Sequence, residues 1–318
     1  MRKKIAMLLV CLAIGIPVGA VSPEPGPVAA ISEAVFGEGG PTVAAGAAVT
    51  PNGLVVLLTD YGADSIYVGT LKGAIYAKSP TVRIETLTNS VPPYDILVGA
   101  HLLAEGSKEF PSGTTFCCVV DPGVGTGRKA IVLETKNGRL FVGPDNGLLS
   151  LVARRDEIAS LREATNKALW RQGPVSHTFQ GRDIFGPVAV AVASGVPLSE
   201  VGPEIKDIVR LQNEESRIEG GIVHGKVVRT DDYGNIITNI AAEDLERIGL
   251  KPNDTAEITI GKARFVAPRK STYSDVPKGE RVLLVQSSGL VECAINLGTL
   301  AGAIGEGVHA DVTVKKAP

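Results

Sequence analysis

The chain has 318 residues, enough for two domains, with a formal net charge of −2 and a pI near 6.1. This nearly neutral balance, with no basic run beyond the extreme N-terminus, excludes the charge pattern of a nucleic-acid-binding protein. The four cysteines and four histidines have no metal-ligand spacing, so we expect neither a disulfide framework nor a bound metal.

The first twenty residues have the layout of a secretory signal peptide. Three basic residues, RKK, precede a short apolar run, and the small residues VGA at 18–20 follow it. We therefore predict that residues 1–20 are removed on export and that the protein is secreted or periplasmic, without membrane contact afterwards. An uncleaved membrane anchor is the alternative, although Pro17 and the short run suit it poorly. Residues 21–52, rich in Ala, Gly, Pro and Val, are predicted to be a flexible spacer.

From Leu54 the sequence alternates between strand and helix patterns, which is typical of a sheet with helices on its faces. The Asn-Gly pair at 137–138 predicts a hairpin, so the sheet should be mixed and mostly parallel. We predict an N-terminal α/β domain over residues 53–210. Its expected strands are 54–59, 82–87, 114–120, 130–135 and 139–143, and its expected helices are 65–80, 94–110, 148–157 and 183–195. Cys117 and Cys118, in the third strand, are interpreted as small buried hydrophobes on opposite faces.

A polar stretch near residues 205–220 marks a boundary, beyond which nearly every pattern is a short strand. We predict a smaller C-terminal all-β domain, barrel-like, over residues 218–316. Its expected strands are 221–230, 235–240, 256–261, 263–268, 281–286 and 309–316, with one helix at 242–250.

The stretch VVDPGVGTGRKA, residues 119–130, raises the question of what its glycine-rich loop holds. A phosphate loop requires a helix directly after the glycines, whereas here two hairpin strands follow. Asp121 and Arg128 therefore stand at the two ends of a loop between strands. They form either a simple turn cap with its ion pair or a site at the carboxyl end of a strand, where open α/β sheets place their ligands.

Other polar residues also collect at predicted strand ends. Each could be a turn residue or a cap, as Asp183 could be an N-cap, but their shared position favours a site. Carboxylates, an amide, aromatics and glycines suit a ligand with a cationic part, hydroxyls and an aromatic base. The residues concerned are Asp60, Asp145, Asn146, Phe179, Gln180, Arg182, Asp183, Asp231, Tyr233, Asn235, Ser287, Ser288 and Glu292.

These motifs together carry a specific resemblance. The strings TDYG, YVGTLKG, VPPYD, VVDPGVGTGR, GPDNGLL, TFQGRDIF, DDYGNIITNI and SSGLVECA occur in this order over about residues 54–315. They resemble the S-adenosylmethionine-using family that contains hydroxide adenosyltransferases, fluorinase and chlorinase. The resemblance implies an N-terminal α/β domain, a C-terminal β domain, and a homotrimer that binds S-adenosylmethionine where two subunits meet.

The same resemblance implies roles for individual residues. Asp60 would hold the ribose hydroxyls, Tyr94 would line the ligand, and Asp231 would receive the methionine ammonium. Tyr233 would lie against the nucleoside and Asn235 would bind the adenine edge. Ser287 would contact the methionine carboxylate, and the remaining motif residues expected at the substrate are Phe179, Ser288 and Glu292.

The resemblance implies that Asp121 and Arg128 are two members of an Asp-Arg-His triad. In the hydroxide-using branch of the family, this triad is held to position and activate the attacking water. The chain departs from the family at the third member, because TFHGRD is here TFQGRD and the histidine is Gln180. Glutamine can orient a water but cannot accept its proton at neutral pH. General-base help is worth about 10²–10⁴-fold, so the substitution predicts a slow enzyme rather than an inert one.

The sequence thus predicts an S-adenosylmethionine hydrolase in which water or hydroxide attacks C5′ and releases adenosine and methionine. S-adenosylmethionine is the substrate, and no separate cofactor is expected. Two alternatives remain at this stage. One is a binding protein with impaired turnover, favoured by Gln180. The other is a halide-using enzyme, disfavoured because the carboxylate of Asp121 repels anions.

Overall fold

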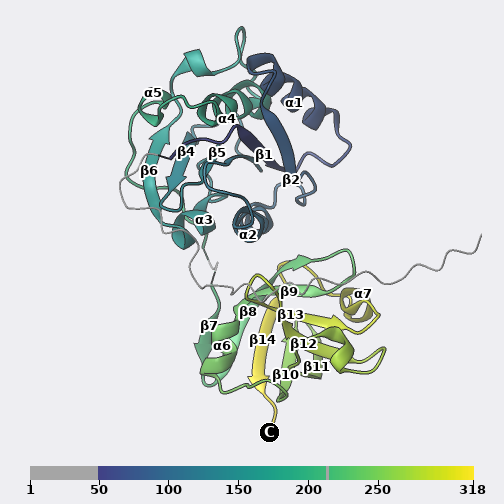
Figure 1. Ribbon diagram of the computed structural model, residues 1–318. Coiled ribbons are helices and arrows are strands. Elements are labelled where there is room, and N and C mark those ends of the chain that lie inside the picture. Colours follow the sequence, from purple (N-terminus) through teal and green to yellow (C-terminus); the bar gives the residue numbers. More distant parts are fainter. Residues whose placement is uncertain (1–48, 213–214) are drawn as a thin grey trace, which may run out of the picture. The chain divides into compact units, whose positions relative to one another are not determined.

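A computed structural model describes residues 49–212 and 215–318 (Figure 1). The predicted signal peptide and nearly all of the predicted spacer lie outside the described residues. Within the described ranges, no helix combines the length and apolarity needed to cross a bilayer.

The N-terminal half is built on a six-stranded mixed sheet with the order β2-β1-β3-β5-β4-β6. β1 runs parallel to β2 and β3, and β3 runs parallel to β5, whereas β4 is antiparallel to both β5 and β6. The predicted hairpin is therefore confirmed. The strands are β1 Leu54–Thr59, β2 Arg83–Thr88, β3 Thr115–Val119, β4 Ala130–Thr135, β5 Leu140–Pro144 and β6 Ile158–Glu163.

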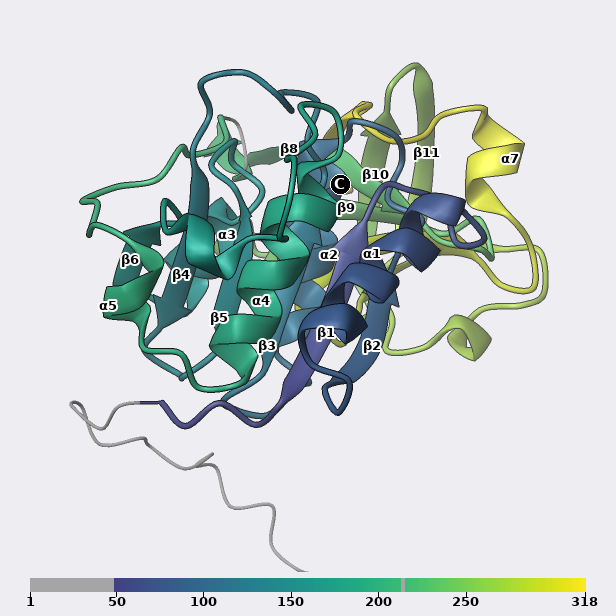
Figure 2. The same cartoon turned by 90° about the horizontal axis from the view of Figure 1, so that it is seen from above.

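Helices cover both faces of this sheet. On one face α1 and α4 lie side by side (Figure 2), and α2 and α3 pack on the other face. Because neighbouring residues of a strand point to opposite faces, Cys117 lies in the core beneath α1 and α4, and Cys118 lies in the core beneath α2 and α3, as predicted. The helices are α1 Ile66–Lys78, α2 Ile96–Ser107, α3 Ser150–Arg155, the π-helix Gly181–Phe185, α4 Gly186–Ala193, and the short α5 Leu198–Val201.

The C-terminal half is an antiparallel sheet of eight strands with the order β11-β10-β14-β8-β9-β13-β12, and β7 is added to β8. A bridge between Arg269, just after β11, and Leu283 of β12 joins the two edges, so the sheet is a nearly closed barrel around one core. The strands are β7 Arg217–Glu219, β8 Ile222–Thr230, β9 Ile236–Ala241, β10 Thr255–Ile260, β11 Ala263–Pro268, β12 Arg281–Val285, β13 Leu290–Ile295 and β14 Asp311–Lys316; the helices are α6 Ala242–Arg247 and α7 Leu300–Ile304.

Some elements differ from the predictions. Glu292 was expected at a glycine turn, but it lies inside β13, because the turn occupies only residues 286–289. The alternative interpretation of Asp183 as an N-cap is wrong. Its fully buried carboxylate lies within the π-helix, where it accepts hydrogen bonds from Arg182 and from the backbone N–H of Ser176. Burial raises the pKa of Asp183, but these hydrogen bonds outweigh burial and lower it.

Candidate functional site

The carboxyl ends of β1 and β3 open into a hollow of about 600 Å³, which we call the N-terminal hollow. Its volume is in the range of small-molecule sites. Six of the residues singled out from the sequence line it, together with neighbours that the sequence did not single out. The lining residues are Asp60, Tyr61, Tyr67, Pro93, Tyr94, Val119, Asp121, Val124, Ser176, Thr178, Phe179, Gln180, Gly181 and Arg182.

Asp60 directly follows β1 and fixes the backbone of Tyr94, which also lines the hollow. One oxygen of its carboxylate accepts a hydrogen bond of 2.9 Å from the backbone N–H of Tyr94. Tyr94 has φ of 68°, a left-handed conformation that is uncommon for a side chain of this size, and its ring is 72% exposed. The next residue, Asp95, caps α2 through Val98. Tyr94 therefore lies before the helix in which the sequence placed it, at the edge of the hollow.

The glycine-rich loop from β3 to β4 brings Asp121 and Arg128 together. Arg128 donates from Nε to Oδ1 of Asp121 at 3.0 Å and from Nη2 to Oδ2 at 2.5 Å, and both side chains are nearly buried. The loop needs Gly125, whose φ is +79° and which lies against the carbonyl of His177. A Cβ at Gly125 would lie 2.7 Å from that oxygen.

Gln180 completes the cluster. Nη2 of Arg128 donates to Oε1 of Gln180 at 2.5 Å, and the guanidinium lies over the ring of Phe185 at 5.0 Å from its centroid. Because a guanidinium only donates, the amide oxygen of Gln180 must face it, and the NH₂ group is the part left to turn elsewhere. The side chain of His177 is exposed and is not part of this cluster.

Three aromatic rings form the wall beside this cluster. Tyr61 lies edge-on to Phe179 at 5.7 Å between centroids and at 6.0 Å from Tyr67, and Tyr67 lies edge-on to Phe179 at 5.3 Å. Sequence reasoning named Phe179 but missed both tyrosines. A usable signal existed for Tyr61, since it directly follows the strand-end carboxylate Asp60.

A second hollow of about 730 Å³, the C-terminal hollow, lies at one end of the barrel. It is lined by Asp232, Tyr233, Asn235, Tyr273, Ile295, Asn296, Leu297, Gly298 and Thr299. Asp231 stands behind this wall, where its carboxylate accepts from the backbone N–H groups of Tyr233 and Asn235 and from the Asn235 amide at 2.9–3.0 Å. It thus fixes the turn that presents Tyr233, which is 80% exposed.

Glu292 is buried and reaches the same hollow through another side chain. The hydroxyl of Tyr273, a residue that the sequence analysis did not identify, donates to Oε1 of Glu292 at 2.6 Å. Burial raises the pKa of Glu292, and the negative charges of Asp231 and Glu105 add to this, against the Tyr273 hydrogen bond and the charge of Arg229. Burial and the neighbouring Glu292 likewise raise the pKa of Tyr273.

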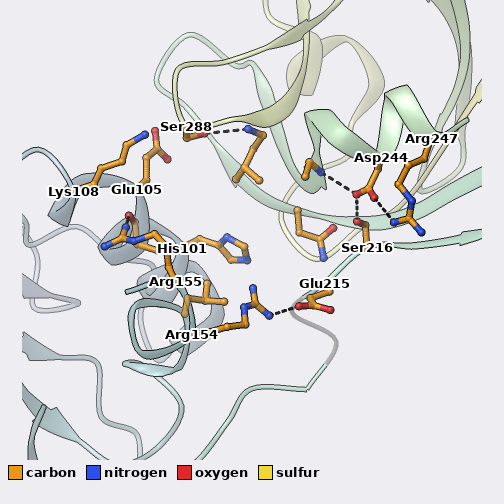
Figure 3. A pocket seen from close by; sticks show the side chains of 15 residues that line it. His101, Glu105, Lys108, Arg154, Arg155, Glu215, Ser216, Asp244, Arg247 and Ser288 are labelled. Atoms are coloured by element: carbon orange, nitrogen blue, oxygen red, sulfur yellow. Dashed lines mark hydrogen bonds and ion pairs between the residues drawn. The ribbon is translucent and has the colours of Figure 1, made fainter. Parts of the chain in front are cut away.

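The two serines of the turn 286–289 lie apart from both hollows. The backbone carbonyl of Ser287 accepts from Nζ of Lys108, and Ser288 lines a third hollow of about 410 Å³ (Figure 3). Charged side chains around that hollow are paired within the chain: Glu105 with Arg229, Arg154 with Glu215, Arg155 with Asp156, and Arg247 with Asp244. This internal balance gives a ligand little charge to bind, so the first two hollows are the better candidates.

Asp145 and Asn146, also noted at a strand end, act locally. Asp145 accepts from the backbone N–H of Val209, and Asn146 joins the carbonyl of Val120 to the N–H of Leu148. Within residues 49–212 and 215–318 no group of three or more His, Cys, Asp or Glu side chains is placed to hold a metal ion.

Comparison with known proteins agrees with this geometry. The profile described as the SAM hydroxide adenosyltransferase N-terminal domain matches residues 55–202, and the profile of the corresponding C-terminal domain matches residues 225–313. The chain belongs to the SAM hydroxide adenosyltransferase family. The motifs quoted from the sequence thus identified the family correctly.

Relatives from several organisms match most of this family member. The (R)-S-adenosyl-L-methionine hydrolase of Salinispora tropica is 36% identical over 81% of this chain and 95% of its own length. The protein with the same name from Thermus thermophilus is 32% identical over 79% and 95%, and a fluorinase from Actinoplanes is 27% identical over 84% and 98%. A crystal structure of an uncharacterized conserved protein from Thermotoga maritima superposes with a TM-score of 0.79 at 35% identity, covering 82% of this chain and 99% of that one.

Proposed function

We propose that this protein hydrolyses S-adenosylmethionine to adenosine and methionine by attack of water at C5′. The observation that carries the proposal is the buried Asp121–Arg128–Gln180 cluster on the wall of the N-terminal hollow that also presents Asp60. Relatives that match 81% and 79% of the chain are named as hydrolases of this compound. S-adenosylmethionine is then the substrate, and the reaction needs no separate cofactor.

The residues divide by the part of the substrate that they would bind. On the N-terminal hollow, Asp60 accepts from the ribose hydroxyls, and Tyr94 and Phe179 line the nucleoside. On the C-terminal hollow, Tyr233 lies against the base and Asn235 binds its edge. We assign the methionine end to Asp231 and Glu292, which lie behind that hollow. Ser287 and Ser288, which the resemblance also implies at the substrate, lie apart from both hollows, so their contact with the substrate stays a prediction.

The chemical step is a displacement in line with the C5′–S bond. The oxygen of the water forms a bond to C5′, the C5′–S bond breaks, and its electron pair neutralises the sulfonium to give the thioether of methionine. The proton lost by the water passes to the carboxylate of Asp121 and from there to solvent. Because a sulfonium is already a good leaving group, holding a desolvated water in line supplies much of the rate.

Arg128 and Gln180 hold this arrangement together. Arg128 fixes the carboxylate of Asp121 through two nitrogens and takes the oxygen of Gln180, so the Gln180 NH₂ group is available to donate to the water. The carboxylate also disfavours a halide at the same place, because two negative charges would meet in a poorly solvated site.

We further propose that the protein is a homotrimer whose sites are shared between subunits. The two hollows have no lining residue in common, although each carries only part of the expected substrate contacts. Exposed Tyr94 and Tyr233 and the 80% exposed Leu297 lie at their rims. Residues 53–210 and 218–316 would be the domains that supply the two sides of each site.

Secretion or location in the periplasm, after removal of residues 1–20, remains part of the proposal. The physical basis is the layout of the N-terminal sequence. Comparing the mass of the mature protein from an exported fraction with that of the full chain tests it: a loss that corresponds to residues 1–20 supports export, and an intact N-terminus in the membrane fraction supports an anchor.

Product analysis tests the hydrolase proposal. The protein incubated with S-adenosylmethionine should release adenosine and methionine in equal amounts, with or without added chloride. Asp121→Asn, which keeps the shape of the side chain, should lose about 10²–10⁴-fold in kcat while still binding adenosine. Chloride-dependent formation of a 5′-chloro nucleoside would favour the halide alternative, and binding without any product would favour the binding protein.

A further inference from the structure

Tyr61 lines the N-terminal hollow, and its hydroxyl has no role in the mechanism proposed above. Tyr61 lies two residues beyond β1, and its ring packs on the core beneath α1 and α4. The rings of Tyr67 and Phe179 hold it on two sides. The ring is therefore fixed in place, and the position of its hydroxyl is fixed with it.

That hydroxyl lies directly over the backbone next to Gln180. A Cβ built on Gly181 would lie 2.2 Å from Oη of Tyr61 and 3.3 Å from Cζ of the same ring. No residue other than glycine fits there without moving the hydroxyl. The Tyr61 hydroxyl thus lies against the residue that follows Gln180 in the chain, and Tyr61, Gln180 and Asp121 line the same hollow.

The hydroxyl also lacks a partner in the part of the chain that the structure describes. No hydrogen bond joins Oη of Tyr61 to any group of residues 49–212 or 215–318, and the side chain, which is only partly buried, lines the N-terminal hollow. A phenol hydroxyl that faces a hollow without a protein partner is free to bond to water or to a ligand there. Burial raises the pKa of Tyr61, and the charges of Asp60 and Asp121 add to this, so the phenol stays protonated.

We propose that the Tyr61 hydroxyl is a further hydrogen-bonding partner of the attacking water, acting together with Asp121 and Gln180 in the same hollow. The inference rests on the proposed hydrolase function. A water poised to attack C5′ must direct a lone pair at the carbon, so its two protons need acceptors. Asp121 is one acceptor. The oxygen of Tyr61 is the second, and the Gln180 NH₂ group donates to the remaining lone pair.

The direct test removes only this oxygen. Tyr61→Phe keeps the ring and its contacts, so KM for S-adenosylmethionine and the affinity for adenosine should stay near the natural values, while kcat falls about 10- to 100-fold. Tyr76→Phe is the matched control. Tyr76 is a partly exposed tyrosine of α1 that does not line the hollow, and its loss of a hydroxyl should leave kcat unchanged.

A second pair of variants uses the contact with Gly181. Gly181→Ala should displace the Tyr61 hydroxyl and lower kcat to a similar extent. In Tyr61→Phe the hydroxyl is already absent, so adding Gly181→Ala should cost little more. If the loss in kcat of the double variant equals the product of the two single losses, the proposal is contradicted. It is also contradicted if Tyr61→Phe has the same kcat as the natural protein. A natural protein that releases no adenosine would overturn the hydrolase function itself, which keeps the two failures distinguishable.

Discussion

The side chain of Gln180 presents an accepting edge and a donating edge, and Arg128 takes the accepting one. A histidine at this position would meet the same guanidinium. One ring nitrogen would have to accept from Arg128, and the other would then carry the proton of the neutral ring. Glutamine and neutral histidine would therefore present the same order of acceptor and donor, and the proton of the water would go to Asp121 in either case.

This geometry changes the expectation of a slow enzyme that the sequence alone suggests. Gln180→His should alter kcat by less than about tenfold and should add no pH dependence near the imidazole pKa of about 6.5. Gln180→Ala, which removes the donor, should lose about 10- to 100-fold. Adenosine release between pH 5.5 and 8.5 measures both. A histidine variant that gains more than about 10²-fold, with a rate that rises through pH 6.5, would assign the missing base to position 180.

Glu292 offers a test of the C-terminal hollow. Since its pKa is raised in the folded state, the folded protein binds the proton more tightly than the unfolded chain does. Its ionisation therefore lowers stability as pH rises through and above the usual carboxyl range. Glu292→Gln keeps an oxygen for the Tyr273 hydroxyl and removes this cost. The unfolding midpoint of the variant, relative to that of the natural protein, should therefore increase as the pH is raised from 4 to 8. A constant difference over that range would contradict the assignment.

Residue types and strand ends were sufficient to locate half of the candidate site. Asp60, Asp121 and Arg128 could be predicted because each lies at a strand boundary, where a parallel sheet exposes its ends. Tyr67 and Tyr273 could not, because an isolated tyrosine has the same pattern in a core as in a pocket. Nor could the sequence tell that Asp231 uses its carboxylate to hold its own turn.

At the scale of elements, α2 carries a partly buried histidine, His101, that lines the third hollow (Figure 3). Nε2 of His101 is buried without a hydrogen-bond partner in the described ranges. Burial, with the charge of Arg154 added, lowers the pKa of His101 to about 4. The unfolded chain therefore takes up this proton first on acidification, and stability is lost as pH falls from about 6.5 to about 4.

His101→Gln should remove this part of the acid sensitivity. The difference in unfolding free energy between pH 7 and pH 4 should shrink by up to about 3 kcal/mol relative to the natural protein. His177→Gln, at an exposed histidine, serves as the control and should leave the difference unchanged. Denaturant titrations at several pH values measure the unfolding free energy. If its change with pH is the same in His101→Gln as in the natural protein, the ring is not held neutral.

Most elements could be predicted from periodicity, and the exceptions have local causes. β6, with the sequence IASLRE, was missed because its alternation is weak and it follows a helix without a turn signal. β13 was missed because Glu292 interrupts an otherwise apolar run in which the tertiary fold supplies the partner, Tyr273. The π-helix before α4 leaves no mark in composition; within it the buried carboxylate of Asp183 pairs with the partly exposed Arg171 and Arg182.

At the scale of the whole molecule, the proposed site requires two subunits. Mixed trimers test this directly. Asp60→Ala and Asn235→Ala should each be inactive, but after co-refolding in equal amounts about a quarter of the sites should combine two natural sides. Asp60→Ala mixed with Asp121→Ala is the matched control, because both changes fall on the same hollow and no natural site can form. Equal activity of the two mixtures, once mixed trimers are verified, would count against a shared site.

The central claim is that water attacks C5′ of S-adenosylmethionine. Hydrolysis in water enriched in ¹⁸O, followed by mass spectrometry of the products, tests it most directly. The account predicts one ¹⁸O atom in the 5′-hydroxyl of adenosine and none in methionine, because the oxygen bonds to C5′ as the C5′–S bond breaks. Unlabelled adenosine, or methylthioadenosine together with labelled homoserine, would place the attack elsewhere and contradict the account.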